Sequence, residues 1–369
     1  MRSAYGISDP GPGDQPLSAR GYRHSVVPGS PRPTAPAVAD VTGADGVYRD
    51  PLWRVSVELS DLERELLRRW WVRRLGFVAH AGAAAIATTQ SYTRLEHSLG
   101  LLALTAYFAP GDATARAAAL LHDVGHLPLS HTFEGVVGLD HHELGEQRIA
   151  DLAELLTAHG VDTDEVIAVD TGERESVLRG GSGALKLDHL ESLVRSGRAH
   201  GRTRQAPPDT LTRLEVVDGA VSTDLATGHY LAELVAGEAR WLCSTINAVP
   251  SGVVRHLAGT LLTDASAARR AEIAAMTDDE FWVLLLSEPS TTQVARALRR
   301  DPTWDTCDVD DRVGDGITYA VPHLYLDMPL VDGRPLPATH PAFDELPGMP
   351  WSRRILPPPG INLPTADSP

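Results

Sequence analysis

The apolar residues of this chain recur at helical spacing over most of the stretch from residue 60 to residue 300. Four of the expected helices begin with a Ser, Thr or Asp followed three residues later by Glu, the pattern of a capping box. These pairs are Ser60 and Glu63, Thr93 and Glu96, Asp140 and Glu143, and Thr277 and Glu280. The pattern predicts a largely helical protein.

Short strands are expected beside the helices. Residues 54–59 alternate like a strand, residues 212–224 predict a hairpin that turns at Asp218 and Gly219, and residues 318–336 predict a second hairpin. The helices are expected at residues 60–75, 93–108, 112–126, 140–160, 188–201, 230–246, 251–264 and 276–287, with a short helix after Pro128. We therefore expect an all-α fold, a helical bundle with small β-hairpin additions.

Composition divides the chain into three parts. Residues 1–46 are rich in Pro, Gly, Ser and Asp and are expected to be a disordered tail. Residues 47–300 are expected to form the main domain, and residues 301–369 a C-terminal hairpin and Pro-rich tail that packs on it or trails from it. With no apolar signal segment, no membrane-length apolar run and only Cys243 and Cys307, a cytoplasmic location is expected.

The net charge, 33 minus 49 or −16, opposes diffuse binding to nucleic acid. Five arginines surround Trp70 and Trp71 in residues 64–74, but the acidic whole favours a solvated arginine face over a nucleic-acid site. A phosphorylated small molecule is still a suitable ligand, because local arginines can outweigh a remote negative field.

Residues 117–134, AAALLHDVGHLPLSHTFE, contain more histidine and carboxylate side chains than the packing of a buried helix requires. His122, Asp123, His126 and His131 lie within ten positions, and imidazole and carboxylate are the ligands that a borderline divalent metal takes. His126 is expected one helical turn beyond His122, on the same face. We interpret this stretch as half of a metal site.

Two other segments offer the remaining ligands. Arg94 and His97 lie at i and i+3 on one expected helix, and Asp188 begins another, on which it shares a face with Ser192 and Ser196. Taken alone, a buried His or a helix-capping Asp has an ordinary structural explanation.

Taken together, these residues resemble the H…HD…D signature of the HD superfamily of metal-dependent phosphohydrolases. The phrases TRLEHSLG, HDVGHLPLSHTFE and HHELG are most similar to the deoxynucleoside triphosphate triphosphohydrolase branch, which includes the sterile-alpha-motif and HD-domain protein. The resemblance covers roughly residues 48–287. It implies a helical HD bundle and assembly as a homo-oligomer.

The resemblance also implies roles for individual residues. The metal ligands would be His97, His122, Asp123 and Asp188, which together suit a divalent ion such as Fe, Mn, Mg, Co, Ni or Zn. Arg94 would clamp a phosphate of the substrate. The residues placed around the scissile phosphate would be His126, His131, Glu134 and His142.

The chain departs from this branch at the residues expected to contact substrate. Arg74 stands where the branch has a glutamine before its Leu-Gly pair, here Leu75 and Gly76. His189, Ser192 and Ser196 replace a lysine, a tyrosine and an aspartate on the Asp188 helix, on the face expected to line the pocket. The sequence therefore supports the metal chemistry better than it supports the deoxynucleoside triphosphate specificity.

Two other functions are compatible with the same signature. A nucleotide-sensing or scaffold protein could keep the HD fold without efficient hydrolysis, and the missing lysine and tyrosine favour this alternative. A di-iron oxygenase would require further His ligands at a longer spacing than His126 and His131 provide.

Overall fold

A computed structural model describes residues 41–43, 45–181, 183–309, 316–337 and 340–364. The predicted tail, residues 1–46, lies almost entirely outside these residues. None of the described helices combines the length and the apolar character that crossing a bilayer requires.

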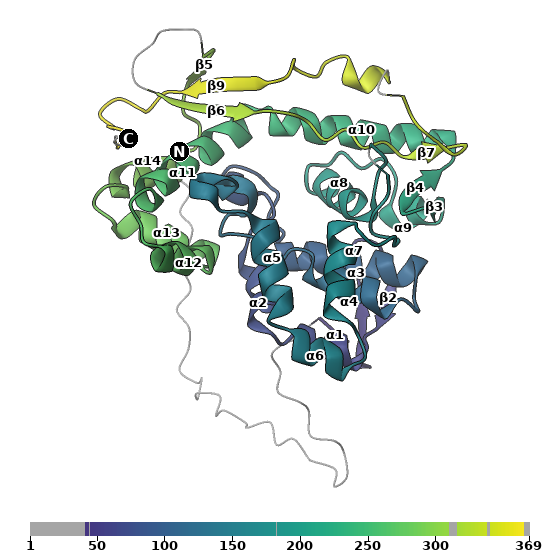
Figure 1. Cartoon of the computed structure of the whole chain (residues 1–369). Coiled ribbons are helices and arrows are strands. Elements are labelled where there is room, and N and C mark those ends of the chain that lie inside the picture. Colours follow the sequence, from purple (N-terminus) through teal and green to yellow (C-terminus); the bar gives the residue numbers. More distant parts are fainter. Residues whose placement is uncertain (1–40, 44, 182, 310–315, 338–339, 365–369) are drawn as a thin grey trace, which may run out of the picture. The chain divides into compact units, whose positions relative to one another are not determined.

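Helices dominate the described residues, which confirms the predicted fold class (Figure 1). The α-helices are α1 (Asp61–Leu66), α2 (Trp70–Arg74), α3 (Arg94–Phe108), α4 (Ala113–Leu121), α5 (His141–Ala150), α6 (Ala153–Ala158), α7 (Thr163–Thr171), α8 (Leu187–Ala199), α9 (Pro207–Leu211), α10 (Leu225–Leu242), α11 (Thr245–Leu262), α12 (Ala267–Ala274), α13 (Asp278–Ser287) and α14 (Thr292–Arg300). Short 3-10 helices connect them at η1 (Leu75–Phe77), η2 (Gly82–Ile86), η3 (Ser130–Phe133), η4 (Val136–Gly138) and η5 (Pro341–Phe343).

Three small sheets accompany the helices. The hairpin predicted at residues 212–224 is confirmed, because β3 and β4 pair across Asp218 and Gly219, both of which have positive φ. The strands are β1 (Val47–Arg49), β2 (Ser56–Glu58), β3 (Leu214–Val217), β4 (Ala220–Thr223), β5 (Thr306–Cys307), β6 (Ile317–Val321), β7 (Leu330–Val331), β8 (Arg334–Pro335) and β9 (Trp351–Ile355).

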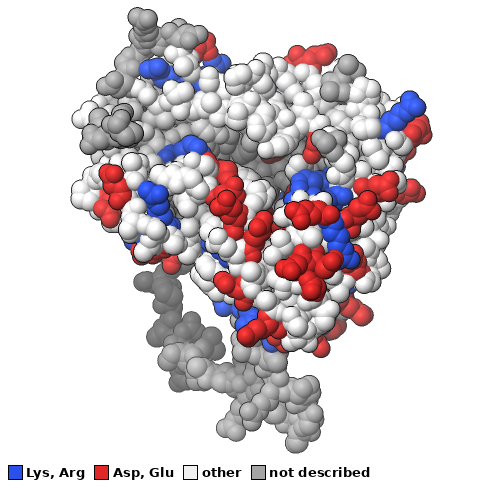
Figure 2. Space-filling view, viewed as in Figure 1, with Lys and Arg blue, Asp and Glu red and all other residues white. Residues whose placement is uncertain are grey.

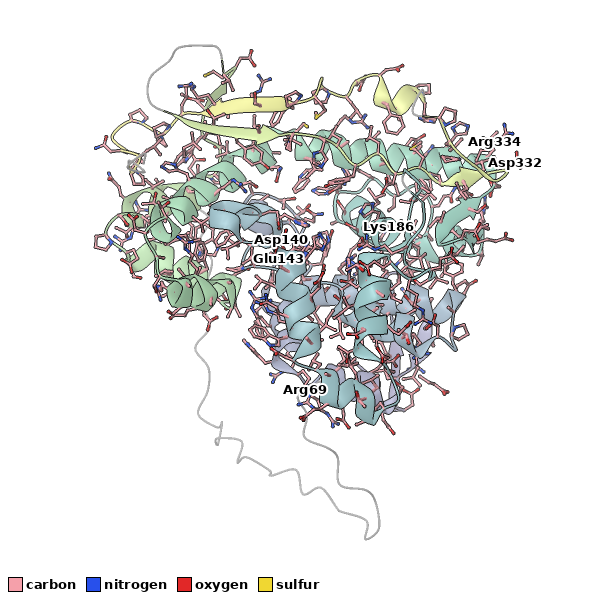
Figure 3. All side chains as sticks on the ribbon, viewed as in Figure 1. Arg69, Asp140, Glu143, Lys186, Asp332 and Arg334 are labelled. Atoms are coloured by element: carbon pink, nitrogen blue, oxygen red, sulfur yellow. The ribbon has the colours of Figure 1, made fainter. Side chains whose placement is uncertain are left out.

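The hairpin predicted at residues 318–336 is confirmed only in its second half, at residues 330–335. β6 pairs with β9, and the two strands run side by side over α11 (Figure 1). Within residues 318–336, the tight hairpin is formed by β7 and β8, at the position that Asp332 and Arg334 mark in Figure 3. Pro322 directly follows β6 and cannot donate a ladder hydrogen bond, so the chain leaves that sheet and crosses to α8 instead.

The helix predicted at residues 60–75 is broken at Arg69, whose ψ of 143° is extended. Because of this break, Leu66 and Leu67 before it and Val72 and Leu75 after it all pack into the same hydrophobic core. Trp70, at the start of α2, is left 47% exposed. The helix predicted at 140–160 is likewise divided into α5 and α6.

The helix starts agree with the predicted caps. Ser60, Thr93 and Thr277 each form a complete capping box. At α5, Asp140 accepts from the backbone N–H groups of His142 and Glu143, so the cap is present while Glu143 itself is exposed.

Two glycines permit the close packing that positions the site. α3 packs against α4 and α8, and a Cβ at Gly100 would collide with the carboxylate of Glu191 on α8. A Cβ at Gly125 would overlap the carbonyl of His141 at the start of α5. Gly100 therefore lets α8 approach α3, and Gly125 lets α5 approach the segment that carries His122 to His126.

Candidate metal centre and adjoining cavity

Four side chains from three elements converge in the core. His97 comes from α3, His122 and Asp123 from the end of α4, and Asp188 from the first turn of α8. His97 Nε2 and His122 Nε2 lie 3.2 Å and 3.4 Å from Asp188 Oδ1. The Asp123 carboxylate lies 4.0 Å and 3.9 Å from the same two nitrogens. The structure thus brings all four predicted metal ligands together, and we call them the four-ligand site.

The donor atoms of this site suit a divalent cation. The ligand atoms of His97, His122 and Asp188 all lie within 4.8 Å of one another. Two imidazoles and two carboxylates match the charge of such an ion and leave coordination positions for other ligands. These residues therefore fit the metal that the sequence implies.

Two carboxylates that the sequence analysis missed orient the imidazoles. Glu191 Oε2 lies 2.5 Å from His97 Nδ1, and Asp170 Oδ1 lies 2.8 Å from His122 Nδ1. Each pair leaves Nε2 free to face the centre, as metal-binding histidines require. Glu191 lies three residues after Asp188 on one helix, and this spacing is the only sequence signal for it.

The charges around the site favour a cation. Burial opposes the ionised form of Asp123, but the Arg94 charge together with the neighbouring His126 and His97 outweighs it, so the pKa of Asp123 lies well below its usual value. Burial likewise opposes protonated His97, but the Glu191 charge and the hydrogen bond that His97 donates to Asp188 raise the pKa of His97 to about 9. The negative field that holds a proton on His97 would equally stabilise a bound metal ion.

Arg94 lies beside the four-ligand site, as the phosphate-clamp prediction requires. It is 4% exposed, its Nη1 lies 3.2 Å from Asp123 Oδ2, and its Nε donates to Ser130 Oγ at 2.9 Å. Ser130 in turn donates to the carbonyl of Ala79 at 2.6 Å. The guanidinium is therefore fixed next to a metal ligand.

A second group of imidazoles, His126, His131 and His141, adjoins the site, and we call it the histidine cluster. Their ligand atoms lie within 4.8 Å of one another. α4 ends at Leu121, so His126 lies on the following turn and not on the helical face predicted for it. Glu134 Oε2 lies 2.5 Å from His141 Nδ1.

His142, the predicted catalytic residue of α5, is exposed, and its ring centre is 4.0 Å from that of His141. The structure brings His141, and not His142, into the histidine cluster. The two adjacent histidines are equivalent in sequence, and only the direction in which α5 begins distinguishes them.

Arg74 and Leu75 do not agree with a substrate-binding role. Both are fully buried. The Arg74 guanidinium donates to the backbone carbonyls of His126, Ala274, Ala275 and Met276. Arg74 therefore fastens the segment after α12 to the turn that carries His126, because a buried guanidinium must satisfy all its donors.

The other three predicted substrate residues lie at or near a cavity of about 120 Å³ beside α8. His189 and Ser192 line it, whereas Ser196 is buried and donates to Glu238 Oε2 at 2.5 Å. The remaining lining residues are Leu193, Val235, Glu238, Ala239, Leu242, Tyr325 and Asp327.

The cavity adjoins the four-ligand site through His189. Its Nε2 lies 3.7 Å from Asp188 Oδ2, and its Nδ1 lies 2.7 Å from Asp327 Oδ2. Lys186 Nζ also lies 3.2 Å from Asp188 Oδ2. Tyr325 and Asp327 come from the segment after β6, more than 120 residues after α8, so no local sequence signal could have placed them here.

The space-filling view shows this face of the molecule hollowed between α5 and α8 (Figure 2). Asp140 and Glu143 lie on the α5 side and Lys186 on the α8 side (Figure 3). Charged groups of opposite sign therefore face each other across the opening.

Comparison with known families matches residues 94–173 to the HD domain. The uncharacterized protein MJ1154 of Methanocaldococcus jannaschii is 32% identical over 108 residues, which cover 28% of this chain and 24% of that protein. The uncharacterized protein YwfO of Bacillus subtilis is 28% identical over 169 residues, 40% of this chain and 39% of that protein. The chain thus spans about a quarter of the length of MJ1154 and about two fifths of the length of YwfO.

Two solved structures share the fold. A phosphohydrolase from Bacteroides thetaiotaomicron has a TM-score of 0.55 at 18% identity, over 73% of this chain and 81% of its own. A hypothetical protein from Aquifex aeolicus has a TM-score of 0.57 at 19% identity, over 70% and 76%. The matched residues 94–173 include His97, His122 and Asp123, and Asp188 follows shortly after them. Residues 94–173 of the chain are thus similar to the HD domain.

Proposed function

We propose that this protein is a metal-dependent phosphohydrolase that acts on a nucleotide, in its sharpest form a deoxynucleoside or ribonucleoside triphosphate. The observation that carries the proposal is the convergence of His97, His122, Asp123 and Asp188, with the fixed guanidinium of Arg94 beside Asp123. The HD match and the shared fold with a phosphohydrolase support it.

The roles of the protein groups follow from their positions. A bound divalent cation would polarise a phosphate oxygen and acidify the attacking water. Arg94 would hold a second phosphate oxygen, because it lies next to a cation ligand and is already oriented by Ser130. Imidazole N–H groups of His126 and His131 would donate to the remaining oxygens.

The Glu134–His141 pair is suited to proton transfer. Glu134 lies 2.5 Å from His141 Nδ1, so its charge would stabilise the protonated imidazole. His141 could then pass its Nε2 proton to the oxygen of the leaving group. The resemblance placed His142, and not His141, among the residues around the scissile phosphate, and the geometry favours His141.

The size and the lining of the cavity beside α8 suit a ligand that contains a ring. At about 120 Å³ it is smaller than a site for a whole nucleotide, so it suits one ring of the substrate next to the phosphates. Glu238 and Asp327 offer carboxylates to hydroxyl or amino groups of that ring. Lys186, the N-cap of α8, and Tyr325, from the segment after β6, supply an amine and a phenol, which compensates in part for His189 and Ser192.

The test is a panel of nucleoside mono-, di- and triphosphates incubated with the purified full chain and Mn²⁺, followed by product identification. Release of tripolyphosphate supports the sharp version, and release of orthophosphate or pyrophosphate supports a broader phosphohydrolase. No turnover of any compound by metal-loaded protein contradicts the proposal. Recovery of a bound, unhydrolysed nucleotide in that case supports the nucleotide-sensing alternative.

A further inference from the structure

The carboxylate of Glu238, on α10, is held at the wall of the cavity beside α8 through one of its two oxygens. Oε2 accepts from Ser196 Oγ at 2.5 Å and from Arg202 Nη2 at 2.6 Å. Arg202 also donates to Ser196 Oγ at 2.8 Å and to the carbonyl of Gly237 at 2.6 Å. Within the described part of the chain, Glu238 Oε1 accepts no hydrogen bond. The carboxylate is therefore fixed, with one oxygen available to a ligand in the cavity.

The hydroxyl of Ser192 is a second polar group of the cavity wall. Its Oγ lies 3.4 Å from His80 Nε2, and the centre of the His80 ring lies 5.1 Å from that of His97 in the four-ligand site. His80 comes from the segment before α3 and thus connects the two regions. The Ser192 hydroxyl is therefore at the side of the cavity that adjoins the four-ligand site.

α8 sets the spacing between these groups. Asp188, Ser192 and Ser196 follow one another at four-residue intervals on one helical face, about 6 Å apart along the axis. Ser192 is thus one turn from Asp188, and Glu238, which is bonded to Ser196, is about two turns from it. A ligand that extends from the four-ligand site along α8 meets Ser192 first and Glu238 next.

The first ring along this path is the sugar. In a nucleotide whose phosphates lie at the four-ligand site, the sugar separates the phosphates from the base. The cavity, at about 120 Å³, is smaller than a site for a whole nucleotide. Its apolar side chains can pack against the carbon face of a ring; they belong to Leu193, Val235, Ala239 and Leu242.

We propose that Glu238 and Ser192 select a ribonucleotide by binding the 2′- and 3′-hydroxyls of its ribose. A hydroxyl both donates and accepts, so one can donate to Glu238 Oε1 while the other bonds to Ser192 Oγ. Acidic side chains bind ribose hydroxyls in the same way in dinucleotide-binding folds. A 2′-deoxyribose lacks one of the two hydroxyls and leaves a polar group of the cavity without its partner.

This inference deepens the proposed function and rests on it in placing the phosphates at the four-ligand site. Ser196 and Arg202 are positioning residues, because they hold Glu238 and their bonds to it leave only Oε1 for the sugar. The substrate class that follows is a ribonucleoside phosphate and not its 2′-deoxy counterpart.

The test compares each of the four common ribonucleoside triphosphates with its 2′-deoxy counterpart on the full chain and Mn²⁺. We expect kcat/KM to be about tenfold or more higher for the ribonucleotide. Glu238→Gln keeps the shape of the side chain but loses its charge, so the ratio of the two kcat/KM values is expected to fall close to one. Ser196→Ala removes one of the two bonds that hold Glu238 and is expected to give an intermediate ratio.

Glu233→Gln is the matched control. Glu233 is on the same helix, is ion-paired with Arg204 at 2.6 Å and does not line the cavity, so this variant is expected to keep the wild-type ratio. A change of the ratio in Glu233→Gln, or an undiminished ratio in Glu238→Gln, would overturn the inference.

Binding is measured separately from turnover, by isothermal calorimetry of the same nucleotides on chelator-stripped protein. Equal kcat/KM for ribonucleotide and deoxynucleotide in the wild type would overturn the inference and leave the proposed function standing. Tighter binding of ribonucleotides with no turnover after Mn²⁺ is added would support the inference and contradict the hydrolytic function. The absence of both binding and turnover would contradict the two together.

Discussion

The four-ligand site and the cavity beside it share α8 but are built in different ways. In the four-ligand site His97 and Asp123 are buried, and each imidazole has its own carboxylate partner. The cavity has walls from α8, α10 and the segment after β6, and its Tyr325 is 69% exposed. The metal centre is therefore held rigidly, whereas the cavity can change its ligand preference without disturbing the metal.

The largest effect is expected from removing a metal ligand. Asp123→Ala should lower bound metal to a small fraction of the wild-type content and turnover by roughly 1,000-fold or more, because the cation and the Arg94 clamp lose a shared partner. Metal analysis and kinetics on the same samples check this. Wild-type metal content in Asp123→Ala would break the assignment of the four-ligand site.

Glu191→Gln should act through His97 and not on the substrate. The amide keeps the shape but loses the charge beside His97 Nδ1, so metal affinity should fall by about 10–100-fold. Glu146→Gln, at an exposed position of α5, serves as the control. An unchanged metal affinity in Glu191→Gln would show that the buried carboxylate has no part in metal binding.

Asp278 tests how the surroundings of the site depend on pH. Its carboxylate accepts from Ala79 N at 2.7 Å and Leu129 N at 2.6 Å, which fastens the segment before α3 to the turn that carries Ser130. Burial raises the pKa of Asp278 from 3.8 to about 6. The folded state thus binds this proton more tightly than the unfolded state does.

The contribution of Asp278 to stability should therefore be full below pH 4 and be lost as the pH rises through 6. The loss should reach about 3 kcal/mol in the free energy of unfolding. The measurement is urea unfolding of the wild type and of Asp278→Asn at several pH values between 4 and 7. The free energy of unfolding of the wild type, minus that of the variant, should fall as the pH rises. A difference that does not vary with pH would mean that Asp278 is ionised throughout.

The smallest effect is expected on the cavity side. Asp327→Asn removes the charge that orients His189, so KM should change by about two- to tenfold, and unequally among nucleotides, while metal content stays at the wild-type value. Steady-state kinetics with several nucleotides check this. Loss of metal in Asp327→Asn would show that the cavity beside α8 and the four-ligand site do not act independently.

The metal ligands were predictable because they lie in short local motifs. Thr93 and its capping box place His97, and the end of the apolar run in α4 places His122 and Asp123. The partners of these ligands were not predictable in the same way. Asp170 is 48 residues from His122, and Asp327 is 138 residues from His189, so only the tertiary fold brings them together.

The same limit explains the errors in the fold. The break at Arg69 serves the burial of residues on both sides of it, and the pairing of β6 with β9 depends on a strand some 30 residues away. Arg74 illustrates the point for a single side chain. Its position before Leu75 and Gly76 suggested a substrate contact, but its hydrogen bonds extend to a segment 200 residues away.

The most direct test of the metal centre is anomalous diffraction from crystals grown with Mn²⁺. The expected result is a peak about 2.0–2.3 Å from His97 Nε2, His122 Nε2 and oxygens of Asp123 and Asp188. A map without a peak at that position, with these side chains still in direct contact with one another, would contradict the central claim.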